Sequence, residues 1–201
     1  MSAGAGAERV AAELGAASVR GDVRRGEDLD RLIDAALEAH GRIDGAVFNS
    51  GHAPRGDILA LTDADWESGH ALLLRPAFHL ARRLTPLMKR QGNGSVVAIS
   101  SLAALEPAKE FPVSSVYRAA LGAWVRLWAR EVAADGIRVN AVLPSLADNW
   151  PVDDTVRAAL PRGRTVTVEE VAAAVAWLLS DAASGVTGQQ LPVDGGERRG
   201  L

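Results

Sequence analysis

Apolar positions along the chain follow two different periods, and the two periods alternate. Between residues 27 and 40, apolar residues recur every three or four positions, the spacing of a helix that buries one face. Short, continuously apolar runs such as 45–48 and 95–99 are typical of strands that are buried on both faces. The pattern predicts helices over 8–14, 27–40, 63–89, 114–134 and 168–179, and strands over 17–23, 45–48, 95–99, 137–143 and 190–193.

Helices that separate the predicted strands indicate right-handed crossovers, which produce a parallel sheet with helices on both faces. The length of 201 residues and the apolar content of 48% suit one α/β domain over residues 1–201. Open sheets of this kind bind ligands beyond the carboxyl ends of their strands. Those ends carry Asn49–His52, Ser100–Ser101 and Pro144–Ser145, so we expect the site there.

Composition and charge exclude several classes of protein. The chain has no cysteine, which rules out disulfides, thiolate metal sites and a cysteine nucleophile. The net charge is −3 and no basic stripe is present, so no nucleic-acid partner is expected. No apolar stretch is long enough to span a membrane, and the first residues do not resemble a signal peptide. These features predict a cytoplasmic protein.

Histidine is the remaining candidate for metal or proton chemistry. No two of the four histidines have the close spacing of a helical metal pair, so no metal site is expected. His52 follows a strand end that faces the predicted crevice, which makes it a candidate base. The alternative interpretation of His52 is an ordinary loop residue. His70 and His79 are interpreted as surface or interface residues.

The strand-end segments resemble those of the short-chain dehydrogenase/reductase (SDR) family, in the same order along nearly the whole chain. The matching segments are 41–44 with Asn49–Gly51, Val97–Ser101, Gly136–Pro144 and Val186–Gly196. The resemblance implies a Rossmann-like, doubly wound parallel sheet. Because the similarity starts late in the family's pattern, we expect this sheet to lack the family's first two strands.

A glycine-rich turn for a dinucleotide pyrophosphate is not found in the sequence. Gly4 and Gly6 are followed by Arg9 where such a turn needs a third glycine, and no strand precedes them. The sequence therefore predicts an N-terminally truncated member of the family, without the dinucleotide-phosphate-binding βαβ unit, that binds no nicotinamide cofactor. Three positions remain as remnants of the cofactor site that the resemblance implies: Asp22, Asn49 and Gly51.

The catalytic residues that the resemblance implies have changed. Counting back from Gly136–Asn140 places the family's lysine at Arg118 and its tyrosine at Ser114. Counting forward from the family's serine, Ser101, reaches the same Ser114. The asparagine of the family falls at Leu73. A serine is a far weaker acid than a phenol, and an arginine stays protonated, so the usual proton transfer is impaired.

Tyr117 is an alternative proton donor. It lies three residues after Ser114, which is a rotation of about 300° on a helix. Its hydroxyl would reach Ser101 only if the start of that helix were distorted. The alternative interpretation is a tyrosine that packs beside Val113 and Leu121 with its hydroxyl at the rim.

These changes lead to three hypotheses for function. The favoured one is an SDR-derived protein, non-catalytic or cofactor-independent, that has lost stand-alone NAD(P)-dependent carbonyl/alcohol redox activity. The second is a cofactor-free cyclase, dehydratase or isomerase that reuses the crevice, with Ser101, Tyr117, Arg118 and His52 as candidates. The third is an NAD(P)-dependent oxidoreductase whose N-terminal segment is absent through a gene-model error. Internal replacements such as Ser114 and Arg118 favour the first, because an error at the start cannot produce them.

The predicted helix over Ser114–Ala134 carries a broad apolar surface that includes Trp124 and Trp128. In the SDR family the corresponding helix packs against its mate in a neighbouring subunit. We therefore expect a homo-oligomer, or a hetero-oligomer with an intact SDR, through this helix, since tryptophan is enriched at interfaces. The alternative is a simple core face. A small-molecule substrate is the other expected partner.

Overall fold

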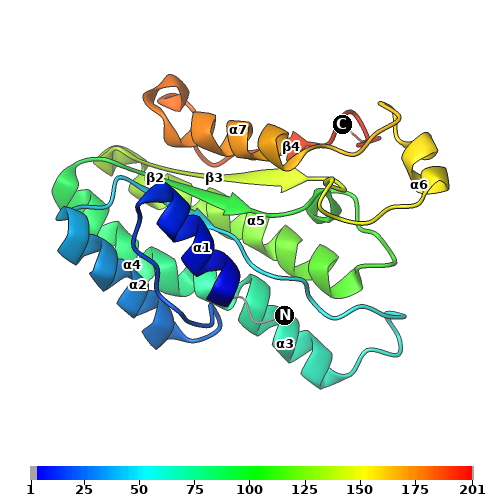
Figure 1. The fold of residues 1–201 in the computed structure, drawn as a ribbon, viewed down its shortest axis with the longest axis horizontal. Coiled ribbons are helices and arrows are strands. Elements are labelled where there is room, and N and C mark those ends of the chain that lie inside the picture. Colours follow the sequence, from blue (N-terminus) through cyan, green and yellow to red (C-terminus); the bar gives the residue numbers. More distant parts are fainter. Residues whose placement is uncertain (1–3, 201) are drawn as a thin grey trace.

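The computed structural model describes residues 4–200, and its centre is a four-stranded parallel sheet (Figure 1). The strands lie side by side in the order β1 (Gly45–Phe48), β2 (Gly94–Ile99), β3 (Ile137–Pro144) and β4 (Gln190–Val193). Every pair is parallel, so the carboxyl ends of all four strands meet at one edge. The predicted Rossmann-like α/β fold is confirmed.

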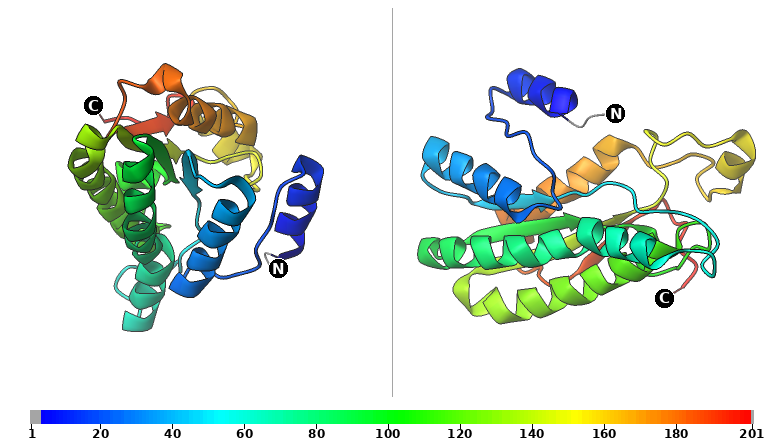
Figure 2. Two further views of the ribbon diagram at one scale, coloured as in Figure 1. Left: turned by 90° about the vertical axis from the view of Figure 1, so that its left-hand side faces the viewer. Right: turned by 90° about the horizontal axis from the view of Figure 1, so that it is seen from below.

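Helices cover both faces of the sheet (Figure 2). Helices α2 (Gly26–His40), α4 (Arg75–Gln91) and α5 (Pro112–Val132) lie on one side, and α7 (Val168–Leu179) lies on the other. The other helices are α1 (Gly4–Leu14), α3 (Asp63–Leu73) and the short α6 (Asp154–Ala159). Within residues 4–200, no helix has the length and apolar character that crossing a bilayer would need.

The apolar core is divided by the sheet into two clusters. The larger one lies under α4 and α5 and includes Leu121, Val139 and Leu143, all at most 1% exposed. The smaller one lies under α7 and includes Val142 and Leu178. Successive residues of β3 therefore point to opposite clusters. This explains why the second half of the strand, residues 141–143, is apolar without alternation.

The strand expected over residues 17–23 does not form. Residues 16–22 have no regular structure, and within residues 4–200 no strand pairs with the outer edge of β1. Without a neighbouring strand, the backbone groups of this segment find other partners. The N–H of Asp22 donates to the Asp28 carboxylate at 2.8 Å, and the backbone N–H of Arg24 donates to the Asp22 carboxylate at 2.9 Å.

The helix expected over residues 63–89 is divided at Leu74. Helix α3 begins with a capping box between Thr62 and Asp65, and α4 starts afresh one residue after the break. Pro76 lies in the first turn of α4. Because proline has no N–H and its ring clashes with a preceding turn, it favours the start of a helix over the middle.

The two tryptophans of α5 pack within the chain. Trp128 is 7% exposed, and its Nε1 donates to the Thr85 hydroxyl of α4 at 2.9 Å. Trp124 is half-buried and meets Phe78 of α4 edge to face, with 4.5 Å between the ring centroids. The expectation that these side chains face another subunit is therefore not met. They join α5 to α4, as the alternative interpretation of a core face requires.

Candidate functional site

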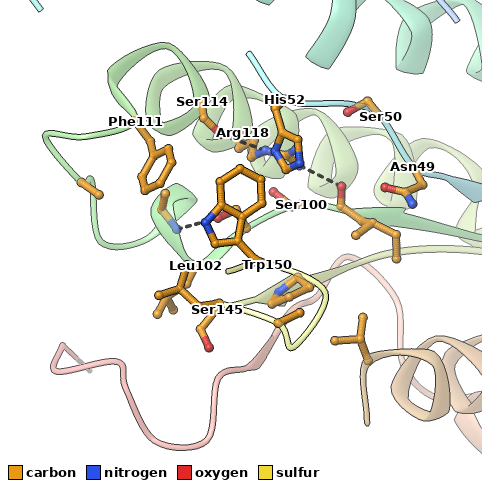
Figure 3. Close-up of a pocket in the computed structure, with 18 of the residues that line it drawn as sticks. Asn49, Ser50, His52, Ser100, Leu102, Phe111, Ser114, Arg118, Ser145 and Trp150 are labelled. Carbon is orange, nitrogen blue, oxygen red and sulfur yellow. Dashed lines mark hydrogen bonds between the residues drawn. The ribbon is translucent and has the colours of Figure 1, made fainter. Parts of the chain in front are cut away.

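A cleft of about 1430 Å³ opens at the carboxyl ends of the strands (Figure 3). Residues that directly follow β1, β2 and β3 line it, among them Asn49, Ser100 and Ser145. The start of α5 and one side of α7 form its walls. Because the carboxyl ends of parallel strands are where open α/β sheets bind ligands, this cleft is the candidate site.

Ser101, Ser114 and Arg118 all line this cleft. Ser101 follows β2, and its Oγ accepts the N–H of Ala103 at 3.2 Å at the start of a short 3₁₀ turn. Ser114 and Arg118 are one turn apart on α5 and so share a face of the helix. The Nε of Arg118 donates to the Ser114 Oγ at 3.0 Å. The structure thus brings together a hydroxyl and a cation at the cleft.

Arg118 is held in a fixed position by a second hydrogen bond. Its Nη1 donates to the backbone carbonyl of Ile99 at 2.9 Å, and the side chain is 7% exposed. Burial lowers the pKa of Arg118 to about 10, and among residues 4–200 no carboxylate acts in the opposite direction. The guanidinium therefore remains protonated near neutral pH.

Side chains from three separate loops surround the mouth of the cleft. The Arg55 guanidinium lies 4.5 Å from the ring centroid of Phe111 and 4.6 Å from that of Trp150. The exposed His52 ring lies 4.7 Å from the Trp150 ring. Burial, followed by the charges of Arg55 and Arg118, lowers the pKa of His52. His52 is therefore mostly neutral near pH 7 and can accept a proton or a hydrogen bond.

Tyr117 lies away from the cleft. Its ring is 6.1 Å from that of Trp66 and 5.8 Å from that of His70, in a separate hollow beside α3. One helical residue corresponds to a rotation of about 100°, which turns Tyr117 away from the face that carries Arg118. The structure does not bring Tyr117 together with Ser101.

The positions assigned to a cofactor remnant are scattered. Asn49 lines the cleft, and Gly51 lies in the exposed loop after it. Asp22 does not line the cleft. Its carboxylate binds the Arg24 side chain, which holds the pKa of Asp22 at about 2. Leu73 is fully buried at the end of α3. Within the described part of the chain, no group of histidine and acidic side chains could hold a metal ion.

Several residues that line the cleft could not be predicted from the sequence. Arg55, Phe111 and Trp150 come from loops far apart in the chain, and no periodicity or motif links them. Glu197 follows the last strand and also lines the cleft. Its Oε2 is buried without a hydrogen-bond partner among residues 4–200, and burial raises the pKa of Glu197.

The chain belongs to the short-chain dehydrogenase/reductase family. A family model described as enoyl-(acyl carrier protein) reductase matches residues 2–197. A 3beta-hydroxysteroid dehydrogenase from Eggerthella lenta is 35% identical over 192 residues, which cover 90% of this chain and 73% of that protein. A short-chain type dehydrogenase/reductase from Mycobacterium ulcerans is 32% identical in structure-based alignment, with a TM-score of 0.83 over 89% of this chain and 70% of that one.

A further relative has been solved with a cofactor. The 3-ketoacyl-(acyl-carrier-protein) reductase from Brucella melitensis, complexed with NADH, is 28% identical. Its TM-score is 0.89 over 96% of this chain and 84% of that one. The similarity therefore extends over nearly the whole described chain.

Two expectations from the sequence are corrected by these relatives. The chain was expected to have lost nicotinamide-dependent redox activity and to bind no cofactor. The relatives are named as dehydrogenases and reductases, and one of them holds NADH. The expectations rested on the absent glycine-rich turn and on the residues Ser114 and Arg118. The similarity of the chain to these dehydrogenases and reductases is the stronger evidence. The findings instead support the third hypothesis, an NAD(P)-dependent oxidoreductase.

The cleft contains polar atoms that a nicotinamide nucleotide could satisfy. The hydroxyls of Ser50 and Ser100 are buried, line the cleft and have no hydrogen-bond partner among residues 4–200. Buried polar groups are rarely left in this state unless a ligand or water binds them. With Asn49 beside them, they match the ribose hydroxyls and the carboxamide of the nicotinamide end, so the residues present fit that part of the cofactor.

Proposed function

We propose that the protein is an NAD(P)-dependent short-chain oxidoreductase that interconverts a carbonyl group and an alcohol. The observation that carries this proposal is the hydrogen bond from Arg118 Nε to Ser114 Oγ in the cleft that Ser101 also lines. A hydroxyl beside a fixed cation is the arrangement that proton transfer to a carbonyl oxygen needs. The lack of cysteine supports a reducing, cytoplasmic setting.

Each of the three residues has a separate task in this chemistry. The bound nicotinamide supplies or accepts the hydride. Ser101 donates a hydrogen bond to the substrate oxygen and orients the carbonyl. Arg118 occupies a lone pair of the Ser114 oxygen, so the hydroxyl proton of Ser114 is free to turn toward the substrate. The positive charge also stabilises the oxygen that has given up its proton, which makes Ser114 a stronger acid than a free serine.

The test follows a deuterium label through the reaction. The purified chain is incubated with C4-deuterated NADPH or NADH and the N-acetylcysteamine thioester of acetoacetate, or with a cyclic ketone. We expect deuterium at the carbinol carbon of the product by mass spectrometry. The Ser101→Ala, Ser114→Ala double variant should lose this transfer, whereas Ser184→Ala, at an exposed serine that does not line the cleft, should retain it. Absence of labelled alcohol at saturating nucleotide, with every substrate, would refute the proposal.

We further propose that two copies of the chain associate through the exposed side of α5. Val116 is 48% exposed and Leu127 is 62% exposed, and exposed alanines at 119 and 123 lie between them. These positions recur at helical spacing, so they form one apolar strip along the helix. Apolar strips of this kind on a folded chain are typical of interaction surfaces.

Replacing Leu127 with glutamate should dissociate the assembly. A charge at the C-terminal end of the apolar strip would have to be buried without a partner, which opposes association. Multi-angle light scattering at micromolar concentration should give a multiple of 21.1 kDa for the unmodified chain and about 21.1 kDa for Leu127→Glu. Leu59→Glu, at a position that is 93% exposed outside the helices, is the control and should leave the mass unchanged. A monomeric unmodified chain would contradict the prediction.

A further inference from the structure

The segment that follows β4, residues 194–200, is folded into a turn by its first side chain. The carboxylate of Asp194 accepts the backbone N–H groups of Gly196 and Arg198, each at 3.0 Å. Gly195 and Gly196 have φ values of 64° and 89°, a left-handed conformation that glycine adopts without strain. The turn directs the end of the segment toward the loop that follows β2.

Glu106, in the loop after β2, binds the far end of this segment. Its Oε1 accepts the backbone N–H of Arg199 at 2.5 Å and the backbone N–H of Gly200 at 2.7 Å. Within residues 4–200, no other hydrogen bond joins the segment to this loop. One carboxylate therefore connects two parts of the chain that are 93 and 94 positions apart.

The charge of Glu106 strengthens both bonds. A carboxylate that accepts backbone N–H groups is stabilised in its ionised form. The two N–H groups lower the pKa of Glu106, burial opposes them, and the charges of Arg198 and Arg199 lower the pKa further. A carboxyl group whose pKa is lowered in the bonded state holds its partners above the ordinary carboxyl range and releases them only as the pH falls below it. Both bonds are therefore made at neutral pH.

Glu197 shows why the segment needs to be held. Its side chain lines the cleft, and its Oε2 is buried with no hydrogen-bond partner among residues 4–200. Burial raises the pKa of Glu197, an effect that the Ser145 hydroxyl opposes and that the charges of Asp194 and Glu106 increase. A buried oxygen without a partner is more stable in water, so Glu197 favours release of the segment from the cleft. The two bonds to Glu106 act against this release.

We propose that Glu106 is a positioning residue that holds residues 194–200 in place as one wall of the cleft, and that the substrate binds against this wall. The first part stands without the proposed oxidoreductase function, whereas the second rests on it. The wall consists of Glu197 and Arg199, which both line the cleft. Without the Glu106 carboxylate, the segment would separate from the loop, and the cleft would lose both side chains and open to water there.

The loop that carries Ser101 does not depend on the Glu106 side chain. The N–H of Ala104 donates to the Ser101 carbonyl at 3.0 Å, and the backbone N–H of Glu106 donates to the Leu102 carbonyl at 3.0 Å. These bonds involve only the backbone, so they remain when alanine replaces Glu106. Loss of the carboxylate should therefore weaken substrate binding and leave the chemical step unchanged.

The first arm of the test needs neither nucleotide nor substrate. Hydrogen–deuterium exchange with mass spectrometry follows the peptide that contains Arg199 and Gly200, and the amides of β3 show whether the fold is intact. We expect Glu106→Ala to exchange the amides of Arg199 and Gly200 at least about tenfold faster. Glu106→Gln should fall between, because an amide oxygen accepts a hydrogen bond without the charge.

Glu110→Ala is the matched control for this arm. Glu110 is an exposed acid on the same loop, and its side chain makes no hydrogen bond to the segment within residues 4–200. This variant should exchange as the unmodified chain does. Unchanged exchange in Glu106→Ala, or equally faster exchange in Glu110→Ala, would overturn the positioning role.

The second arm measures kcat and KM for a cyclic ketone and for the N-acetylcysteamine thioester of acetoacetate at saturating nucleotide. We expect Glu106→Ala to raise KM at least about fivefold and to keep kcat within about twofold, which is the pattern of binding lost equally from the ground state and the transition state. Glu106→Gln should recover part of this loss. Glu169→Ala, at an exposed acid on α7 that does not line the cleft, is the control and should keep both constants.

The two arms separate the two parts of the proposal. Faster exchange with an unchanged KM would support the positioning of the segment and refute substrate binding against it. A fall in kcat at unchanged KM would also refute that second part, because it would place the effect in the chemical step. No turnover by the unmodified chain would refute the proposed function and the second part with it, while the exchange measurement would still decide the first.

Discussion

Replacing Leu121 with alanine is expected to lower the free energy of unfolding by about 4 kcal/mol. Leu121 is 1% exposed and lies in the larger core cluster between α5 and the sheet, where β3 supplies Val139 and Leu143. Truncation would remove buried methyl groups and leave a cavity that these neighbours, fixed in a helix and a strand, cannot fill. Equilibrium denaturation in urea, followed by circular dichroism, measures the change.

The matched control for this substitution is Leu59→Ala. Leu59 is 93% exposed, so the same chemical change should alter the free energy of unfolding by less than about 0.5 kcal/mol. A loss at Leu121 no larger than the loss at Leu59 would show that α5 is not packed on the sheet in solution as described. A changed slope of the denaturation curve would instead indicate a different unfolded state.

The substitution Ser114→Tyr is expected to raise kcat for carbonyl reduction by about 10²-fold or more. A phenol has a pKa of about 10, far below that of an alcohol, so it gives up its proton more readily in the transition state. Arg118 lies beside this position and would stabilise the phenolate. The cleft of about 1430 Å³ has space for the ring. Single-turnover reduction with excess enzyme measures the chemical step.

Ser114→Phe is the control for this prediction. It introduces the same ring without the hydroxyl, so any effect of bulk or packing appears in both variants. We expect Ser114→Phe to be no faster than the unmodified chain. Equal rates for the tyrosine and phenylalanine variants would mean that proton transfer at position 114 does not limit the reaction. The proton donor would then be a different group in the cleft.

The order of elements could be predicted from the sequence because each has a local cause. Helix α7 and strand β4 match their expected bounds, Val168–Leu179 and Gln190–Val193, since periodicity and flanking turn residues define both ends. The strand expected over 17–23 does not form because a strand needs a hydrogen-bonded neighbouring strand. A local sequence pattern does not reveal whether such a neighbour is present. The break at Leu74 was signalled by Pro76 but was missed, because the apolar pattern continues on both sides of it.

The candidate site was predictable only where the residues follow strands or share a helical face. Ser101 could be placed at the cleft because it follows a strand end, and Arg118 because the family resemblance assigns it to the position of the catalytic lysine. Tyr117 could be tested by helix register and lies elsewhere. Arg55 and Trp150 could not be found, since their contact joins two loops whose approach depends on the whole fold. That Arg118 has no carboxylate partner among residues 4–200 is also visible only in three dimensions.

The Arg55 guanidinium lies against the rings of both Phe111 and Trp150, so one side chain links three loops beside the cleft. Each contact of a cation with an aromatic face contributes about 0.5–1 kcal/mol at an exposed site. Separating both therefore costs about 1–2 kcal/mol, which leaves the separated arrangement populated at roughly 3–15% at equilibrium. Loop movements of this kind take place in nanoseconds to microseconds, far faster than a typical turnover. A ligand whose entry requires these loops to separate would therefore meet a rapid pre-equilibrium, which lowers its association rate constant by the open fraction and leaves kcat to the slower chemical step.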